Sequence, residues 1–114
     1  MAEPAAEPAK LAAELPAALA RGDWSGLGDW PAAQQLELLQ KLCHDLMALA
    51  AGAQPRFFPA AQLPAPPRLA LLAIWSRELM AAARSVEHPY NGGLMQEAWA
   101  ARTRQVLAVR PARA

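Results

Sequence analysis

Hydrophobic side chains recur along the chain at spacings of three and four residues, which is the period of an amphipathic helix. Four segments carry such a stripe, over residues 3–21, 31–51, 66–86 and 91–109. The stripes are, in order, Leu11, Leu15 and Leu19; Leu36, Leu39, Cys43, Leu46 and Ala50; Leu72, Trp75, Leu79, Ala83 and Val86; and Met95, Trp99, Thr103 and Val106. The pattern predicts an all-α chain that folds as a single helical bundle of four to five helices over residues 1–114.

Glycine and proline residues mark where the first two helices end or begin. Gly22 and Gly52 are expected to stop them, and Pro31 suits the first turn of the second helix. Pro16 lies inside the first helix and is expected to bend or split it.

Two connectors, residues 22–31 and 53–67, separate the first three helices, and five prolines keep the second connector from being helical throughout. The side chains expected to anchor the connectors are Trp24, Leu27 and Trp30 in the first and Phe57 and Phe58 in the second. Pro89 breaks the third helix, and Asn91 is a good N-cap for the fourth. Residues 110–114 are expected to fray.

The composition agrees with an all-helical globule. Hydrophobic residues make up 54% of the 114 residues and charged residues 18%, which is a globular composition and not a disordered one. Much of the apolar excess is alanine, which favours helix, whereas isoleucine and tyrosine each occur once.

The net charge of +1 argues against a dedicated nucleic-acid binder, but the charge is unevenly distributed. Residues 1–67 carry four basic and seven acidic side chains, and residues 68–114 carry seven arginines and three glutamates. The basic end contains Arg102, Arg104, Arg110 and Arg113. These arginines form either a solvated helix face or a weak anion contact, and the second reading leaves open a small helical DNA-binding domain.

Cys43 is the only cysteine, so the chain cannot form an internal disulfide, and this fits a reducing cytoplasm. No apolar run reaches the ~20 residues of a membrane span. Glu3 and Glu7 stand where a signal peptide would carry basic residues. We therefore expect a cytoplasmic protein.

The tripeptide Cys43–His44–Asp45 contains three potentially reactive groups. On a helix, consecutive side chains point about 100° apart, so these three cannot converge on one metal or substrate atom. A metal phosphohydrolase of the His-Asp type needs further histidines, and the chain has only His88 besides His44. Neither a phosphate-binding loop nor a dinucleotide-binding glycine motif is present. We expect no catalytic residues, no cofactor and no metal.

Two longer motifs carry a family resemblance. The stretch "LQKLCHDLMALAAGAQPRFFP", a proline-rich linker, a tryptophan-bearing helix and then "EHPYNGGLMQEAW" resemble the C-terminal domain of the delta-prime subunit of bacterial DNA polymerase III, in its beta-proteobacterial form. The resemblance covers about residues 36–107. It implies that the chain is a C-terminal fragment of a longer subunit whose N-terminal part is an AAA+ module.

The resemblance also implies a function. In that family the domain is a non-catalytic helical collar, which packs against the collars of the delta and gamma/tau subunits in a five-membered ring. The ring holds the clamp loader together while the sliding clamp is loaded during DNA replication. No small-molecule substrate, membrane contact or tight DNA binding is expected of this part.

Several residues match recurrent positions of that family, and we expect them to fix loops or to meet a neighbouring subunit. They are His44, Asp45, Arg56, Phe57, Phe58, His88 and Asn91. A candidate partner face lies on the fourth helix, where the arginine stem can cover apolar surface. It consists of Gln96, Ala100, Arg104 and Leu107.

Overall fold

The computed structural model of the chain describes residues 15–27, 30–84 and 92–108. Its elements are a helical turn at residues 15–20, the 3-10 helices η1 (Ser25–Leu27) and η2 (Ala60–Gln62), and the α-helices α2 (Ala32–Ala50), α3 (Leu69–Ala83) and α4 (Gly92–Ala108). Every regular element in these residues is helical, which confirms the predicted all-α bundle.

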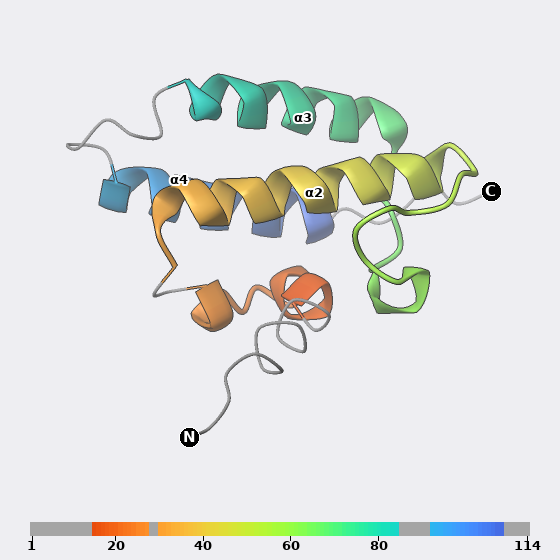
Figure 1. Cartoon of the computed structure of the whole chain (residues 1–114), viewed down its shortest axis with the longest axis horizontal. Coiled ribbons are helices and arrows are strands. Elements are labelled where there is room, and N and C mark those ends of the chain that lie inside the picture. Colours follow the sequence, from red (N-terminus) through yellow and green to blue (C-terminus); the bar gives the residue numbers. More distant parts are fainter. Residues whose placement is uncertain (1–14, 28–29, 85–91, 109–114) are drawn as a thin grey trace.

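The three long helices pack against one another, with α2 as the central element. In Figure 1, α3 runs along one side of α2 and α4 lies behind it. The N-terminal helical turn and η1, drawn in red and orange, lie on the side of α2 that is opposite α3. The second connector loops back beside the C-terminal half of α2.

The predicted stops at Gly22 and Gly52 are confirmed, and both have the same geometry. Each glycine has a φ of 84°, a left-handed conformation that other residues rarely adopt. The N–H of Asp23 donates to the carbonyl of Ala18, and the N–H of Ala53 donates to that of Ala48. These six-residue closures are Schellman motifs, and they turn the chain sharply at both points.

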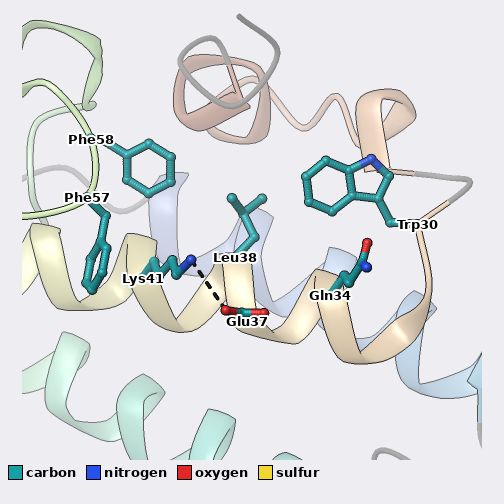
Figure 2. A pocket seen from close by; sticks show the side chains of 7 residues that line it. All are labelled: Trp30, Gln34, Glu37, Leu38, Lys41, Phe57 and Phe58. Atoms are coloured by element: carbon teal, nitrogen blue, oxygen red, sulfur yellow. Dashed lines mark ion pairs between the residues drawn. The ribbon is translucent and has the colours of Figure 1, made fainter. Parts of the chain in front are cut away.

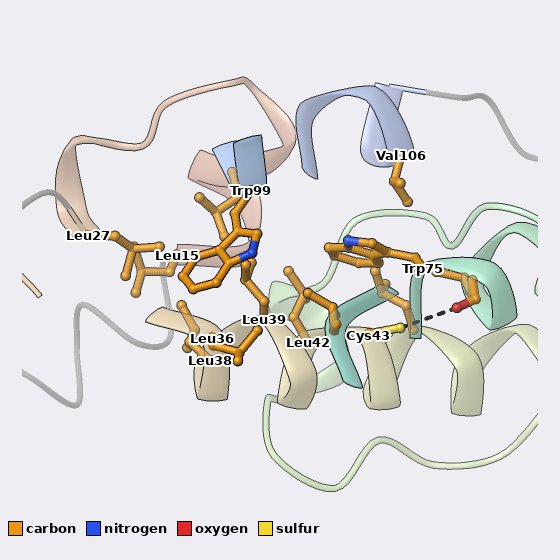
Figure 3. Packing of buried hydrophobic residues seen from close by; sticks show 14 of the residues in the cluster. Leu15, Leu27, Leu36, Leu38, Leu39, Leu42, Cys43, Trp75, Trp99 and Val106 are labelled. Atoms are coloured by element: carbon orange, nitrogen blue, oxygen red, sulfur yellow. Dashed lines mark hydrogen bonds between the residues drawn. The ribbon is translucent and has the colours of Figure 1, made fainter. Parts of the chain in front are cut away.

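The core is built from leucines around two tryptophans. Trp75 and Trp99 are 1% and 8% exposed. In Figure 3 the ring of Trp75 lies between Leu42 of α2 and Val106 of α4, while the ring of Trp99 points towards the leucines of α2 and of the N-terminal turn. The two rings therefore join α2, α3, α4 and the N-terminal turn.

The third helix is shorter than predicted at both ends. It begins at Leu69 and not at Pro66, because the backbone before it is extended, with a ψ of 144° at Arg68. Ala83 and Ala50 were assigned to buried stripes, but both are exposed, since each is at the last position of its helix, beyond the neighbouring core.

The connectors are anchored largely as expected. Leu27 is fully buried, and Trp24 and Trp30 are partly buried against the core. In the second connector only Phe58 is buried, whereas Phe57 is 43% exposed and is not a core anchor. The predicted helix before residue 15, the turn at 85–91 and the tail at 109–114 lie outside the described residues.

Among the helices that the structure describes, none combines the length and the apolar character needed to span a lipid bilayer.

Candidate functional site

Asp45, on the C-terminal half of α2, is completely buried and holds the second connector in place. Its Oδ1 accepts a hydrogen bond of 2.8 Å from the backbone N–H of Arg56. Its Oδ2 accepts bonds of 2.8 Å from the N–H of Phe57 and 2.7 Å from the N–H of Phe58. We call this arrangement, one carboxylate with three consecutive backbone donors, the Asp45 clamp.

Prolines bracket the segment that the clamp holds. Pro55 and Pro59 have no N–H, so the three backbone N–H groups between them are the only backbone donors in residues 55–59, and all three bind Asp45. Proline also fixes φ and narrows the conformations open to the unfolded chain. The sequence P-R-F-F-P is therefore a loop whose donors are aligned for one anion.

The electrostatics of the clamp favour the ionised carboxylate. Burial alone would raise the pKa of Asp45, because a buried charge loses its hydration. The hydrogen bonds from the Arg56 N–H and the His44 ring lower it, and those from Phe58 and Phe57 add to this effect. The balance holds the pKa of Asp45 below its usual value. A carboxylate engaged in this way is structural and is not available as a base or nucleophile.

The free energy of unfolding should depend on pH through the ionisation of Asp45. Because the folded-state pKa of Asp45 lies below the unfolded value of about 3.9, its contribution to stability is complete at neutral pH and is lost as pH falls through the folded pKa. We expect the difference in unfolding free energy between the native chain and Asp45→Asn to be constant near neutral pH and to shrink as pH falls below about 5 and through the lowered folded-state pKa. Urea titrations at several pH values measure it, and a difference that does not vary with pH contradicts this assignment.

An exposed aromatic surface covers the outside of the clamp. The His44 ring stands edge-on to Phe57, with centroids 5.3 Å apart and an interplanar angle of 74°, and its Nδ1 lies 3.1 Å from Oδ1 of Asp45. Lys41 Nζ and the Arg56 guanidinium lie 5.5 Å and 5.6 Å from the Phe57 centroid. Both cations are within the range of a cation–π contact.

A second buried polar residue on α2, Gln35, holds the first connector and was not predicted. Its side chain is 1% exposed, and its Nε2 donates to the carbonyls of Leu27 at 2.8 Å and Trp30 at 3.0 Å. The sequence contains a signal for it, since Gln35 shares a face with Leu38, at helical spacing. Helix α2 therefore holds both connectors, the first through Gln35 and the second through Asp45.

Replacing Gln35 by leucine should destabilise the chain by about 1–3 kcal/mol, because the buried Leu27 carbonyl loses its donor. The neighbouring Gln34 is exposed, so Gln34→Leu is a matched control that should change stability by less than about 0.5 kcal/mol. Chemical denaturation of both variants makes the comparison. Equal effects would show that the Gln35 bonds contribute nothing.

A groove of about 330 Å³ lies along α2 between the two connectors. Figure 2 shows the side chains that line it: Trp30, Gln34, Glu37, Leu38, Lys41, Phe57 and Phe58. Its charged groups neutralise each other, since Lys41 Nζ lies 3.4 Å from Glu37 Oε2. Besides this ion pair, the lining consists of aromatic rings, one leucine and one amide, and it contains no serine, cysteine or histidine.

Cys43 is buried, and its Sγ donates to the carbonyl of Leu72 at 3.5 Å. Burial raises the pKa of the thiol to about 12, so the thiolate is not formed at neutral pH. We expect the folded chain to resist a thiol reagent such as dithionitrobenzoate and to react fully once it is unfolded in urea. Rapid labelling of the folded chain contradicts this prediction.

The candidate face on α4 is only partly free. Arg104 is exposed, but a methyl group added to Gly22 would lie 3.0 Å from its Cδ, so its stem covers the N-terminal turn. Leu107 is half-buried and packs against the core, and Gln96 and Ala100 are also half-buried. The face therefore stays a prediction, with part of Leu107 and part of the Arg104 stem already used in intramolecular packing.

His88 and Asn91, the remaining family-like positions, lie outside the described residues. Within the described part of the chain, no three side chains of histidine, cysteine, aspartate or glutamate come together as a metal site. The basic end is partly neutralised, since Arg102 makes a two-pronged ion pair with Glu78 at 2.8 and 3.0 Å.

Comparison with known proteins adds no relative: no family model, curated protein or solved structure matches the chain significantly.

Proposed function

We propose that the chain is a non-catalytic helical oligomerisation module, the collar domain of a delta-prime subunit of a bacterial DNA polymerase III clamp loader. Its partners are the collars of the delta and gamma/tau subunits, and it acts in the cytoplasm during DNA replication. The observation that carries the proposal is the order and spacing of the two sequence motifs that resemble that family.

The Asp45 clamp supports a structural reading of the first motif. The motif contains the His44–Asp45 pair and the aromatic loop at residues 56–58, and the two form one unit. Both carboxylate oxygens of Asp45 accept hydrogen bonds within this unit. The unit sets how the connector returns along α2 and so fixes the angle between successive helices. A module that joins subunits needs such a rigid frame, whereas a hydrolase needs an accessible reactive group.

Binding to isolated collar domains tests the proposal. The chain is mixed with purified collars of the delta and gamma/tau subunits, and complex formation is followed by sedimentation velocity. We expect a complex that forms with the collars but not with an unrelated helical bundle of similar charge. Because a single domain shares less area than a full subunit, the affinity of one pair is expected to be modest. Absence of any complex up to high concentration contradicts the proposal.

The alternative, a small helical DNA-binding domain, rests on the basic C-terminal third of the chain. The pairing of Arg102 with Glu78 removes one cation from that surface. Titration of duplex DNA at low and high salt separates the two functions, since phosphate contacts give a steep loss of affinity with salt. The collar proposal predicts weak binding, and tight, salt-sensitive binding would favour the alternative.

A further inference from the structure

The helix α3 is apolar on nearly its whole circumference. Its sequence, LALLAIWSRELMAAA, contains only Ser76, Arg77 and Glu78 as polar residues. A helix on the surface of a monomer usually has one apolar stripe and one polar face, and a helix that is apolar all round is usually buried. In α3 the side chains buried in the bundle core are those of Leu72, Trp75 and Leu79. The apolar residues on the other side have no such partner.

The outer face of α3 is defined here by the residues that point away from that stripe at about 100° per residue. They are Ala70, Ile74, Arg77, Met80, Ala81 and Arg84. Ile74 is 46% exposed and Met80 58% exposed, which makes them two of the most exposed large apolar side chains in the described residues. In Figure 1, α3 forms one edge of the molecule, and none of the coloured segments lies beyond it.

The charge on this face has one sign. Arg77 and Arg84 are exposed, and neither has an ion-pair partner among the described residues. The nearest carboxylate on the helix, Glu78, lies on the edge towards α4 and is held by Arg102 at 2.8 Å. Within the described part of the chain, the face therefore combines apolar surface with two guanidinium groups that make no ion pair, and it has no acidic side chain.

We propose that the outer face of α3 is a docking site for an amphipathic helix that carries carboxylates within or beside its apolar stripe. At 15 residues, α3 offers a line of about 22 Å, which matches three to four turns of a partner helix. The small residues Ala70 and Ala81 permit close approach of a second helix, and Ile74 and Met80 provide apolar contact. Acidic side chains opposite Arg77 and Arg84 complete the match.

The position of Arg77 distinguishes this occupant from a lipid surface. A helix that lies in a membrane interface keeps its cations on a separate polar face. Arg77 instead lies in the middle of the outer face, between Ile74 and Ala81, where a membrane would have to bury it and a partner carboxylate can pair with it. The inference does not depend on the proposed function, because it follows from the composition and exposure of α3 alone.

The full chain itself provides the reporter for a test, since Ile74 is its only isoleucine and gives a single methyl signal when the δ1 methyl of isoleucine is selectively labelled. The probes are two synthetic helical peptides of about 20 residues with leucines at helical spacing, one with glutamates and one with lysines beside the stripe. We expect the glutamate peptide to shift the Ile74 signal and to bind at least about tenfold more tightly than the lysine peptide.

Charge reversal tests the arginines. The double variant Arg77→Glu with Arg84→Glu should lose this preference and favour the lysine peptide. The control variant Arg21→Glu with Gln54→Glu and Gln62→Glu changes net charge equally on exposed residues elsewhere and should keep the glutamate preference. If the reversed variant does not fold, the two peptides on the native chain still decide the question.

Three results would overturn the proposal. The first is an Ile74 signal that the glutamate peptide does not move, or that both peptides move equally. The second is a shift caused by phosphatidylglycerol vesicles without any caused by the peptides, which would assign the face to a lipid surface. The third is a shift that appears on raising the concentration of the chain alone, which would assign the face to a second copy of the chain.

Discussion

Replacing Asp45 by alanine is expected to destabilise the chain by about 3–4 kcal/mol, because three backbone donors lose a charged acceptor at once. The N–H of Phe58 belongs to a buried residue and finds no water in its place, so its desolvation is not recovered. Typical domains have only about 5–15 kcal/mol of stability in total, so the loss is a large share. Urea unfolding followed by tryptophan fluorescence measures it.

Two variants on the same helix separate the clamp from general effects. His44→Ala removes only the side chain that lies 3.1 Å from Asp45 and should cost about 1 kcal/mol or less. Glu37→Gln removes an exposed carboxylate paired with Lys41 and should cost less than about 0.5 kcal/mol. If Asp45→Ala costs no more than Glu37→Gln, the clamp does not hold the connector.

Replacing Trp75 by alanine is expected to cost about 3–5 kcal/mol, as for other buried aromatic side chains. The indole is 1% exposed and joins α3 to both α2 and α4, so its removal leaves a cavity that three helices border. The side chain of the adjacent Ile74 points about 100° away and is 46% exposed, so Ile74→Ala should cost less than about 1 kcal/mol. Denaturant unfolding of the two variants provides the comparison, and a cost below about 1 kcal/mol for Trp75→Ala would mean that its ring is not part of the core.

The sequence predicts the helices of this fold well because its large apolar residues carry an unambiguous period. Leu39, Leu46, Leu72 and Trp75 are all buried where the spacing of three and four places them. Alanine carries no such information, since it is common on both faces of a helix. Among the described stripe residues, the two that are exposed, Ala50 and Ala83, are both alanines at the last position of a helix, beyond the neighbouring core.

The clamps could be predicted only in part. Because consecutive side chains on a helix point about 100° apart, the sequence correctly indicates that Cys43, His44 and Asp45 do not converge on one atom. It does not indicate where the Asp45 carboxylate finds its partners, because these lie 11 to 13 residues away in a loop that must first fold back along α2. The role of Gln35 depends in the same way on the path of a connector.

The exposed apolar face of α3 also required the structure. From the sequence, Ile74 and Met80 lie in a helix so rich in apolar residues that several stripes are possible. Only the positions of α2 and α4 decide which stripe faces the core. The sequence placed a candidate partner face on α4, where Leu107 is half-buried against the core.

The most direct test of the proposed collar function is assembly of the five-subunit clamp loader, measured by native mass spectrometry. A delta-prime subunit that ends in this chain is compared with versions in which the chain is deleted or carries charge reversals such as Arg104→Glu and Arg77→Glu on its exposed faces. The account predicts that the deletion abolishes the five-subunit species and that reversals on at least one face reduce it. Normal assembly of every version would show that the chain is not an assembly module and would contradict the account.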